Sequence, residues 1–384
     1  MLNYIILGKP RNDEIKEAGQ LRTVSFYRYI EDNIANASII TAHDNNITNN
    51  MLVRTARGVY DYFRVLSLII FSKNNINILN YHTLVFAHPL DMFAFIKGII
   101  FITVVKISSI MRKGKIIINI HDLPRYQNKD LGYPMYSRDI FYFIFEKILF
   151  NYADELWPTA NEMASLIKRD YKFSNRKKYR IAINGNINRV GETIIDLSRE
   201  NGEMYFVYAG TLNRNRGIEE MIDAFISAKN ENAKLLILGL DEIEMMKDYS
   251  KQNNKIFYLG HKTAEECNAI VSQCDYGIIC YPNKFYFNTT FLTKIALYIT
   301  CEVPILTVNS RIAEQLISNE NIGLSCKQEE LMEKYQYIYK HRDIAVTFKR
   351  NIKKIKNGYY WDTILRNTFQ SFFADLNIVN WEKR

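Results

Sequence analysis

Short apolar runs alternate with longer amphipathic runs along the whole chain. Some short runs are apolar at almost every position, such as YFVYAG at 205–210, LLILG at 235–239 and YGIIC at 276–280. Strands that are apolar on both faces are typical of parallel sheets covered by helices on both sides. The alternation with amphipathic runs predicts βαβ units and an α/β fold. The predicted strands are residues 4–8, 37–43, 84–87, 116–121, 155–158, 179–183, 204–210, 234–239, 256–260, 276–281, 304–308 and 323–326.

A polar, glycine-containing stretch at residues 184–201 separates two such series. We place a domain boundary near Arg189, which gives one Rossmann-like domain over 1–190 and a second over 191–343. Residues 344–384 are predicted to be helices that pack back on the first domain. Two doubly wound domains that face each other leave a cleft at the carboxyl ends of both sheets, where ligands bind.

The segment GTLNRNRG follows the strand predicted at 204–210 and opens an amphipathic helix. Gly210 and Gly217 allow tight turns and close approach of the backbone. Arg214 and Arg216 precede a helix N-terminus, which favours anions, and two guanidinium groups suit a diphosphate. A solvated loop with surface arginines is the alternative.

The segment NTTFLTKIALYITCEVP at 288–304 is the second candidate. Thr289 and Thr290, with Asn288, are good N-cap residues whose amides and hydroxyls suit phosphate oxygens. Lys294 lies on an otherwise apolar helix, where it either extends to solvent or serves an anion.

In these segments the second half resembles the donor-binding domain of GT-B fold glycosyltransferases, especially the group that includes glycosyltransferase family 4. The resemblance implies that Arg216 and Lys294, helped by Arg214, Thr289, Thr290 and Gly210, hold the diphosphate of a nucleotide sugar. It implies that the turn at Gly260 and His261 holds the nucleotide base. The first domain would then bind the acceptor.

The sequence departs from many members of that family at two glutamates spaced eight positions apart. Thr289 and Leu297 occupy those positions, Thr211 replaces a usual arginine, and Glu302 replaces a usual glycine. The Lys-x-x-Leu-Tyr pattern from Lys294 is more like the bacterial glucosyl- and galactofuranosyltransferase branch that lacks the glutamate pair.

The first half resembles the fold at two places. Gly19, Gln20 and Arg22 match the glycine loop and arginine before the first helix, so they are candidates to contact phosphate or acceptor; an ordinary surface loop is the alternative. His121 follows the strand predicted at 116–121. His121 or Asp122 is the candidate base for the acceptor hydroxyl, with a turn-capping role as the alternative for His121.

Missing motifs exclude several classes of protein. The sequence has no GxGxxG after a strand, no GxxxxGK[ST] and no GxSxG, which argues against a nicotinamide dehydrogenase, a P-loop kinase and an α/β-hydrolase. It has no Asp-x-Asp and no metal-ligand spacing of histidines, so we expect no metal and no cofactor beyond the nucleotide sugar, a UDP- or GDP-sugar. His82 and His88 are further candidates for the acceptor side.

The charge of the chain is unevenly distributed. Residues 1–190 carry a net charge of +10 and residues 191–384 carry −1. An excess of one sign indicates partners, here an anionic membrane surface, a nucleic acid or a phosphate-bearing substrate. The five cysteines all follow residue 266 and no CxxC pair occurs, which favours a reduced, cytoplasmic protein.

Three segments of the first half are relevant to membrane contact. Residues 93–111 are apolar except for Lys97 and Lys106, so we expect a buried domain helix, with an interfacial helix as the alternative. Residues 168–180 are strongly basic with interleaved aromatic residues, and 140–152 form a very aromatic helix. We expect peripheral contact with the inner face of the plasma membrane and no nucleic acid.

These observations favour a bacterial hexosyltransferase that moves a sugar from a nucleotide sugar to a glycan or lipid-linked acceptor in surface polysaccharide or glycoprotein glycan synthesis. A non-catalytic nucleotide-sugar-binding subunit and a nucleotide-sugar epimerase of the same fold are the alternatives. A homo-oligomer is compatible with the sequence.

Overall fold

The computed structural model describes the chain except residues 8–17, 42–50, 82–91, 133–137, 174–176, 192–196, 198–201, 213–215, 242–243, 245, 247–248, 250–252 and 384. The predictions for the strand at 84–87 and for His82, His88 and Arg214 therefore lie outside the described residues.

The chain divides into two compact units. Unit 1 comprises residues 1–129, 133–182 and 365–384, and unit 2 comprises 130–132 and 183–364. The division thus falls between Ala182 and Ile183, a few residues before the predicted boundary at Arg189. It also divides the predicted C-terminal tail, because residues 344–364 belong to unit 2 and only those from Leu365 onward belong to unit 1.

Unit 1 contains a six-stranded sheet in the order β2-β1-β3-β4-β5-β6, and every neighbouring pair is parallel. Its strands are β1 (Leu2–Ile6), β2 (Ala37–Thr41), β3 (Ile76–Asn80), β4 (Lys115–Asn119), β5 (Glu155–Trp157) and β6 (Lys178–Tyr179). Its helices are α1 (Ala18–Asn33), α2 (Met51–Phe71), α4 (Met92–Met111), α5 (Pro124–Asp130), α6 (Arg138–Tyr152), α7 (Asn161–Tyr171) and most of α15 (Trp361–Asp375).

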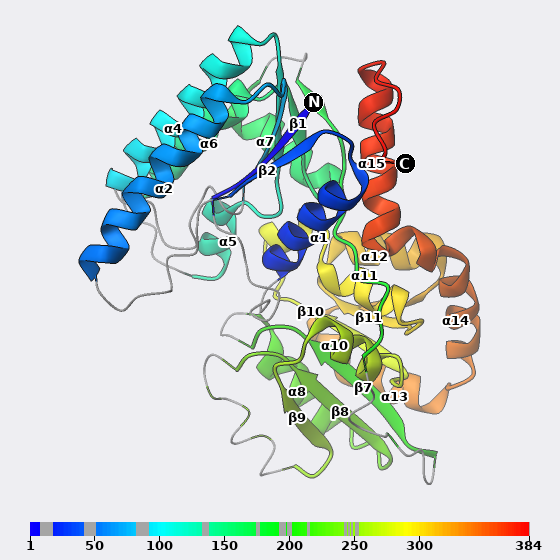
Figure 1. Cartoon of the computed structure of the whole chain (residues 1–384). Coiled ribbons are helices and arrows are strands. Elements are labelled where there is room, and N and C mark those ends of the chain that lie inside the picture. The colour runs from blue at the N-terminus through cyan, green and yellow to red at the C-terminus, as the bar shows by residue number, and fades with distance from the viewer. Residues whose placement is uncertain are drawn as a thin grey trace. The chain divides into compact units, whose positions relative to one another are not determined.

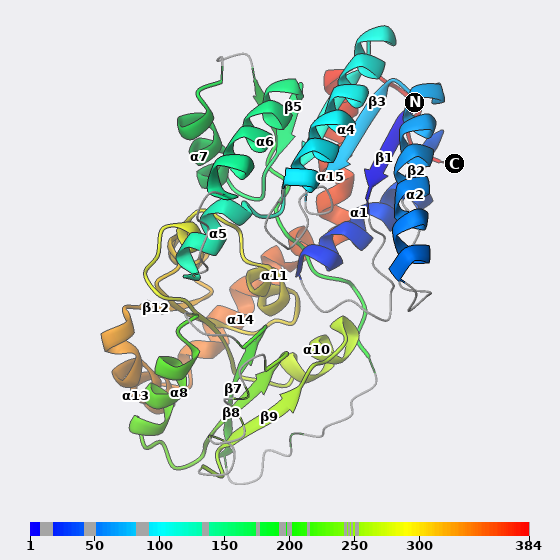
Figure 2. The same cartoon turned by 90° about the vertical axis from the view of Figure 1, so that its left-hand side faces the viewer.

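Helices cover both faces of this sheet (Figures 1 and 2). Helices α2, α4 and α6 lie side by side on one face, and α1 and α15 lie on the other. Aromatic rings join α1 and α15 to β5: Trp157 packs edge-on against Phe369 and Phe372, and Phe26 lies 6.3 Å from Trp157 between ring centroids. The C-terminal helix therefore completes the core of unit 1.

Strand β3 was not predicted from the sequence. Its residues INILN are interrupted by asparagines, which are rare in strands. In the structure these amides are buried and paired: Asn77 accepts a hydrogen bond of 2.9 Å from Asn3 on β1, and Asn80 donates one of 2.7 Å to Thr23 on α1. Partners on neighbouring elements thus make polar strand positions tolerable in the core.

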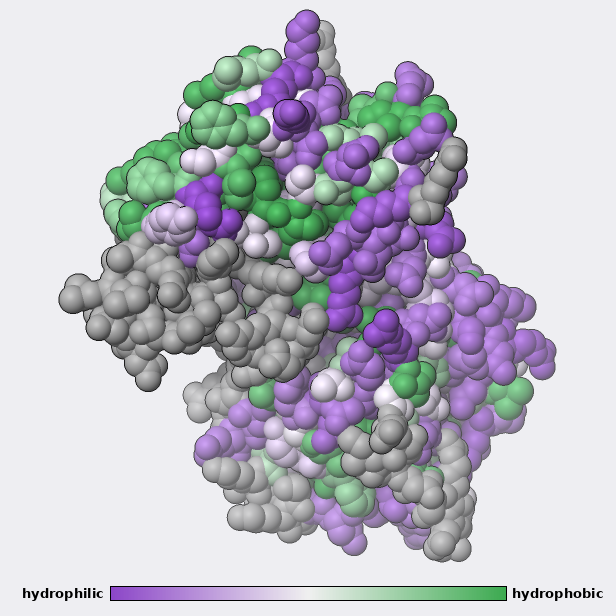
Figure 3. Space-filling model, viewed as in Figure 1, coloured by the Kyte–Doolittle hydropathy of each residue, from purple (hydrophilic) through white to green (hydrophobic). Residues whose placement is uncertain are grey.

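Helix α4 differs from the buried helix that we expected. One side is buried through Phe101, Ile102 and Val105, whereas Phe93 is 66% exposed and Ile110 is 64% exposed. The space-filling view shows a broad hydrophobic surface over α2 and α4 at the upper left (Figure 3). By length and composition α4 could cross a membrane, but its buried side packs within unit 1.

Unit 2 contains a second six-stranded parallel sheet, in the order β12-β11-β10-β7-β8-β9. Its strands are β7 (Met204–Ala209), β8 (Ala233–Leu238), β9 (Ile256–Gly260), β10 (Tyr276–Cys280), β11 (Ile305–Val308) and β12 (Gly323–Cys326). Its helices are α8 (Ile218–Ser227), α10 (Ala264–Val271), α11 (Thr293–Thr300), α12 (Arg311–Glu320), α13 (Leu331–Lys340) and α14 (Ile344–Ile355). The parallel sheets and the α/β fold predicted from the sequence are confirmed.

Helices α8 and α13 pack on one face of this sheet, where Phe206 of β7 contacts the rings of Phe225 and Tyr335. On the other face, α11 lies so close to the sheet that its Tyr298 ring fills the space that a side chain at position 277 would need. A Cβ at Gly277 would lie 2.4 Å from that ring. Glycine in β10 therefore lets α11 approach the sheet.

Candidate active site

The strand order of unit 2 reverses between β7 and β10. The chain runs from β7 through β8 to β9 on one side and then continues with β10 on the other side of β7. In open parallel sheets, ligands bind beyond the carboxyl ends of the strands at such a point. Gly210 follows β7 and Tyr281 follows β10, so these positions lie at the ligand-binding edge of the sheet.

Lys294, from the first turn of α11, is buried at this edge. Its Nζ donates a hydrogen bond of 3.0 Å to the Tyr281 hydroxyl, and it lies 4.7 Å and 5.0 Å from the ring centroids of Tyr208 and Tyr281. Burial alone would lower the pKa of the ammonium, but the hydroxyls of Tyr208 and Tyr281 raise that pKa above its usual value. Lys294 is therefore a cation held between two aromatic rings.

No carboxylate among the described residues forms an ion pair with Lys294. The acidic side chains of the described ion pairs lie elsewhere, for example Glu302 with Lys356 and Glu203 with Lys234. A buried charge without an ionic partner is costly, and an anionic ligand would supply that partner.

Two glycines make room for this cation and for the neighbouring backbone. A Cβ at Gly210 would lie 2.6 Å from Lys294 Nζ, and a Cβ at Gly239, after β8, would lie 2.0 Å from the carbonyl oxygen of Gly210. Backbone hydrogen bonds of 2.8 and 2.9 Å join Gly210 to Leu238 and Gly239 to Gly260. Backbone hydrogen bonds thus join the ends of β7, β8 and β9, and the Tyr258 hydroxyl adds a hydrogen bond of 3.0 Å to the Gly239 carbonyl oxygen.

A second cation lies near Lys294. Arg216 is half-buried and stands just before α8, whose N-cap is Gly217 with φ 74°. The positive charge of Arg216 is among the causes that lower the pKa of Lys294, so the two groups interact electrostatically. The first turn of α8 adds the positive end of a helix dipole. Two of the residues predicted to hold a diphosphate therefore converge, whereas Arg214 lies outside the described residues.

Thr289 and Thr290 do not cap α11 as predicted. The helix begins at Thr293, its N-cap is Leu292, and a short 3₁₀ turn over Tyr286–Asn288 precedes it. Thr289 Oγ1 instead donates a hydrogen bond of 2.8 Å to the carbonyl oxygen of Tyr286. Both threonines are buried on the polypeptide that leads into the helix.

The turn predicted to hold the base follows β9. Gly260 has φ 69°, which a glycine adopts without strain, and no atom lies within 4 Å of the place its Cβ would take. His261 is exposed. The turn is thus open to a ligand.

In unit 1, His121 and Asp122 follow the end of β4. His121 is buried and its Nδ1 lies 2.5 Å from Oδ2 of Asp122, whose side chain is 20% exposed. The imidazole and the carboxylate thus stand side by side directly after the end of β4.

The segment Gly19–Arg22 is not a loop. Gly19, Gln20 and Arg22 lie in the first turns of α1, and Arg22 is almost completely buried. Its guanidinium donates to Oδ1 of Asn119 at 2.7 and 3.1 Å and to the carbonyl oxygen of Ala182 at 2.8 Å. Arg22 therefore supports the end of β4 from inside the domain.

Residues 192–355 match the family described as "Glycosyl transferases group 1". The match covers the greater part of unit 2. The matched range includes Gly210, Arg216 and Lys294. No significantly similar sequence was found among curated proteins.

Solved structures show the same fold over the whole chain. Sucrose-phosphate synthase from Thermosynechococcus elongatus aligns with a TM-score of 0.67 at 14% identity, over 98% of this chain and 99% of that one. HepE from Anabaena, solved with UDP-glucose, aligns with a TM-score of 0.62 at 12% identity, over 97% and 99% of the two chains. WaaG, described as a glycosyltransferase involved in lipopolysaccharide biosynthesis, aligns at 0.64 and 11%, over 97% and 99%. The chain therefore has the GT-B fold, as predicted.

Sequence reasoning missed the roles of the tyrosines at this candidate site, although Tyr298 ends the Lys-x-x-Leu-Tyr pattern. The Tyr298 hydroxyl accepts a hydrogen bond of 3.2 Å from the Ala209 amide and lies within hydrogen-bond distance of the Val207 and Ile278 carbonyl oxygens. It joins β7 to β10 where the strand order reverses. Its spacing of four residues from Lys294 was the available signal, because such residues share one helix face.

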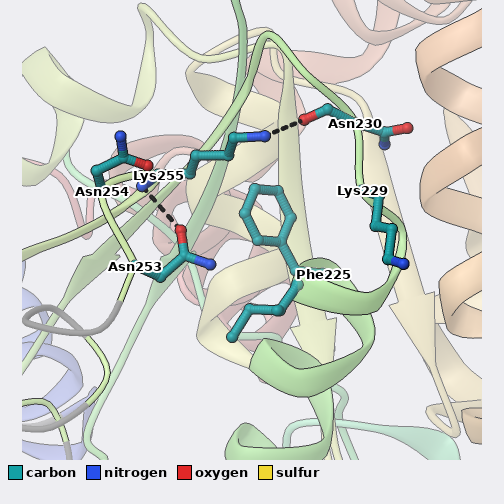
Figure 4. Close-up of a pocket in the computed structure, with 7 residues that line it drawn as sticks. Phe225, Lys229, Asn230, Asn253, Asn254 and Lys255 are labelled. Atoms are coloured by element: carbon teal, nitrogen blue, oxygen red, sulfur yellow. Dashed lines mark hydrogen bonds between the residues drawn. The ribbon is translucent and has the colours of Figure 1, made fainter.

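A separate cavity of about 440 Å³ lies at the opposite edge of the unit 2 sheet. Figure 4 shows the residues that line it, which come from the end of α8 and from the turn before β9. Lys255 donates a hydrogen bond of 3.0 Å to the carbonyl oxygen of Asn230 across it. This cavity is at the amino ends of the strands, so it is not part of the site around Lys294. Among the described residues, no cluster of histidine, cysteine and acidic side chains could hold a metal ion.

Proposed function

We propose that this glycosyltransferase transfers a hexose from a nucleotide-diphosphate sugar to a glycan or lipid-linked acceptor of a bacterial surface polysaccharide or glycoprotein glycan. The observation that carries the proposal is the buried Lys294 ammonium at the carboxyl ends of β7 and β10. HepE was solved with UDP-glucose and with UDP, which supports a UDP-sugar as the first donor to test. The description of WaaG supports an acceptor in surface polysaccharide synthesis.

Unit 2 would bind the donor. Lys294 and Arg216, with Arg214 and the backbone near Thr290, would neutralise the diphosphate, while the turn at Gly260 would hold the base. Negative charge grows on the phosphate oxygen as its bond to the sugar breaks. Fixed cations in a partly buried site stabilise that charge more in the transition state than in the ground state. We propose that no metal ion takes part.

Unit 1 would bind the acceptor. We propose that the His121–Asp122 pair takes the proton of the acceptor hydroxyl as that oxygen attacks the sugar. Asp122 would stabilise the imidazolium that forms, because the carboxylate lies 2.5 Å from Nδ1. Such general-base assistance contributes about 10²–10⁴ in rate.

The donor site can be tested with Lys294→Ala and Arg216→Ala. Each should lower sugar turnover about 100-fold, the effect of losing one charge-stabilising group. Lys340→Ala, an exposed lysine at the end of α13, is the matched control and should behave like the wild type. Calorimetry with UDP-glucose, UDP-galactose and GDP-mannose, followed by turnover with the best-bound donor, gives both readouts.

Near-wild-type turnover in both variants would refute the assignment of the donor site. Donor binding without turnover or hydrolysis under any acceptor would refute the proposed reaction. For the acceptor side, His121→Ala should lower turnover while leaving donor affinity unchanged, and unchanged turnover would remove His121 from the chemistry.

A further inference from the structure

One surface of unit 1 has no role in the proposed reaction. We define the α2–α4–α6 face as the exposed apolar side chains of these three helices. They recur at helical spacing, for example Phe93, Ile96 and Ile100 on α4, so they form one stripe on each helix. The residues are Tyr60, Phe63, Phe71, Phe93, Ile96, Ile100, Ile107, Ile110, Ile140 and Ile144.

The three stripes lie next to one another, because α2 packs against α4 and α4 packs against α6 (Figure 1). The combined apolar surface is visible in the space-filling view (Figure 3). Soluble monomers rarely expose a continuous apolar patch of more than a few hundred Å², and larger ones mark sites of contact with proteins or membranes.

Helix α4 is fixed within unit 1 on its other side. Ser108 Oγ donates a hydrogen bond of 3.1 Å to the Ile69 carbonyl oxygen, and Lys106 Nζ donates one of 3.1 Å to the Tyr152 carbonyl oxygen. These bonds tie α4 to α2 and to α6. A helix of this length is about 30 Å long and would lie along a bilayer rather than cross it.

The charges around this face are one-sided. The three helices contain three carboxylates: Asp61 and Glu146 are buried, and Asp139 pairs with Arg125 at 2.8 Å. Lysines remain at the edges of the face. Lys97 lies over the Phe93 ring at 4.6 Å, Lys147 lies over the Phe143 ring, and the exposed Lys113 follows the end of α4.

We propose that the α2–α4–α6 face docks on an anionic lipid bilayer. Apolar side chains would enter the boundary between headgroups and acyl chains, and the lysines would meet anionic headgroups. A second copy of the chain is the less suitable occupant, because two identical cationic faces would bring like charges together.

The test uses the full chain and vesicles of phosphatidylcholine, with or without an equal share of phosphatidylglycerol. Phosphatidylglycerol should raise the bound fraction at least tenfold, and added salt should reverse that gain. Phe93→Ser/Ile100→Ser/Ile107→Ser should lower binding at least tenfold. The control Met332→Ser/Val346→Ser/Val379→Ser changes exposed apolar residues elsewhere and should bind like the wild type.

Lys97→Gln/Lys147→Gln provides a second variant with the apolar stripe intact, and it should lose the dependence on phosphatidylglycerol. No binding to anionic vesicles, or equal binding by both triple variants, would overturn the proposal. A dimer that the Phe93/Ile100/Ile107 variant converts to monomers, without vesicle binding by the wild type, would show a self-association face instead. Donor affinity should not change in any variant, so failure here is separate from failure of the proposed function.

Discussion

At the scale of single residues, the proposed donor site depends on the absence of a side chain at position 210. Lys294 Nζ and Cε would lie 2.6 and 2.7 Å from a Cβ at Gly210, so any other residue must displace the ammonium. The ammonium can move because it ends a flexible chain, but only by leaving the space between Tyr208 and Tyr281.

Gly210→Ala should therefore weaken donor binding about tenfold, equivalent to about 1.4 kcal/mol. It should also lower thermal stability, because Gly210 has φ 153°, which alanine adopts only with strain. Calorimetry with the donor and a melting curve measure the two effects. Gly358→Ala is a suitable control, because a Cβ there meets no atom within 4 Å. Equal donor affinity in the two variants would contradict the role given to the space at Gly210.

Lys294 and Arg216 could be selected from the sequence because charged residues are conspicuous beside apolar strands. Tyr208 and Tyr281 could not, because a tyrosine in or beside an apolar strand is indistinguishable from core until its hydroxyl has a partner. Arg22 was misplaced for a related reason. A glycine before an arginine suggests an exposed loop, and only the packing shows that Asn119 and the Ala182 carbonyl oxygen hold the guanidinium inside.

At the scale of elements, Tyr298 couples α11 to two strands. Its buried hydroxyl serves β7 and β10, and Gly277 leaves room for its ring. Tyr298→Phe would leave backbone groups at the end of β7 without this partner.

We expect Tyr298→Phe to lower the free energy of unfolding by about 1–3 kcal/mol. Chemical denaturation measures it. Tyr60→Phe removes a hydroxyl from an exposed ring and should change stability by less than about 0.5 kcal/mol. If Tyr298→Phe also changed the free energy of unfolding by less than about 0.5 kcal/mol, the hydrogen bonds of the Tyr298 hydroxyl would contribute nothing measurable to stability.

A second link between elements involves a buried carboxyl group. Glu146 of α6 accepts hydrogen bonds from the hydroxyls of Tyr81 after β3 and Tyr171 of α7. Burial raises the pKa of Glu146 to about 7, although the two tyrosines and Arg125 act against that rise.

Between about pH 4.5 and pH 7 the unfolded chain releases the Glu146 proton and the native protein keeps it. Stability therefore falls as pH rises through this window and levels off above it. Relative to Glu146→Gln, the wild type should lose about 2 kcal/mol of unfolding free energy from pH 5 to pH 8. Denaturation of both proteins at the two pH values gives the difference, and parallel pH profiles would contradict the shifted pKa.

At the scale of the whole molecule, the α/β architecture followed from the apolar strands, but the division of the chain did not. Polar residues at 184–201 suggested the boundary, whereas the rings of Phe369 and Phe372 bring the last helix to Trp157 of unit 1. Such contacts over long sequence separation leave no local pattern. Strand β3 was missed for the same reason, because its asparagines depend on partners from other elements.

The structure also changes the interpretation of the positive charge in unit 1. The basic segment 168–180 was the expected membrane contact, yet Arg180 pairs with Glu155 at 2.7 Å and with Asp375 at 2.8 Å. Lys177 donates to the Asn151 carbonyl oxygen. Part of this segment thus serves contacts inside unit 1.

The donor site as a whole should work without a metal ion, because Lys294 and Arg216 would supply the positive charge. Turnover with saturating donor should be unchanged after dialysis against a strong chelator. Lost turnover that Mg²⁺ or Mn²⁺ restores would show that a cation completes the site. Wild-type protein dialysed without the chelator controls for losses caused by dialysis.

The paired amides of β1 and β3 have a consequence for strand alignment. Asn3 and Asn77 are direct partners in the parallel register and share a hydrogen bond of 2.9 Å in the core. If β3 slipped by one residue along β1, Asn77 would turn to the opposite face of the sheet and separate from Asn3. Each amide would then be buried without the other, at a cost of about 1–3 kcal/mol per group. The pair thus penalises competing alignments of the central strands, which interchangeable isoleucines and leucines would allow.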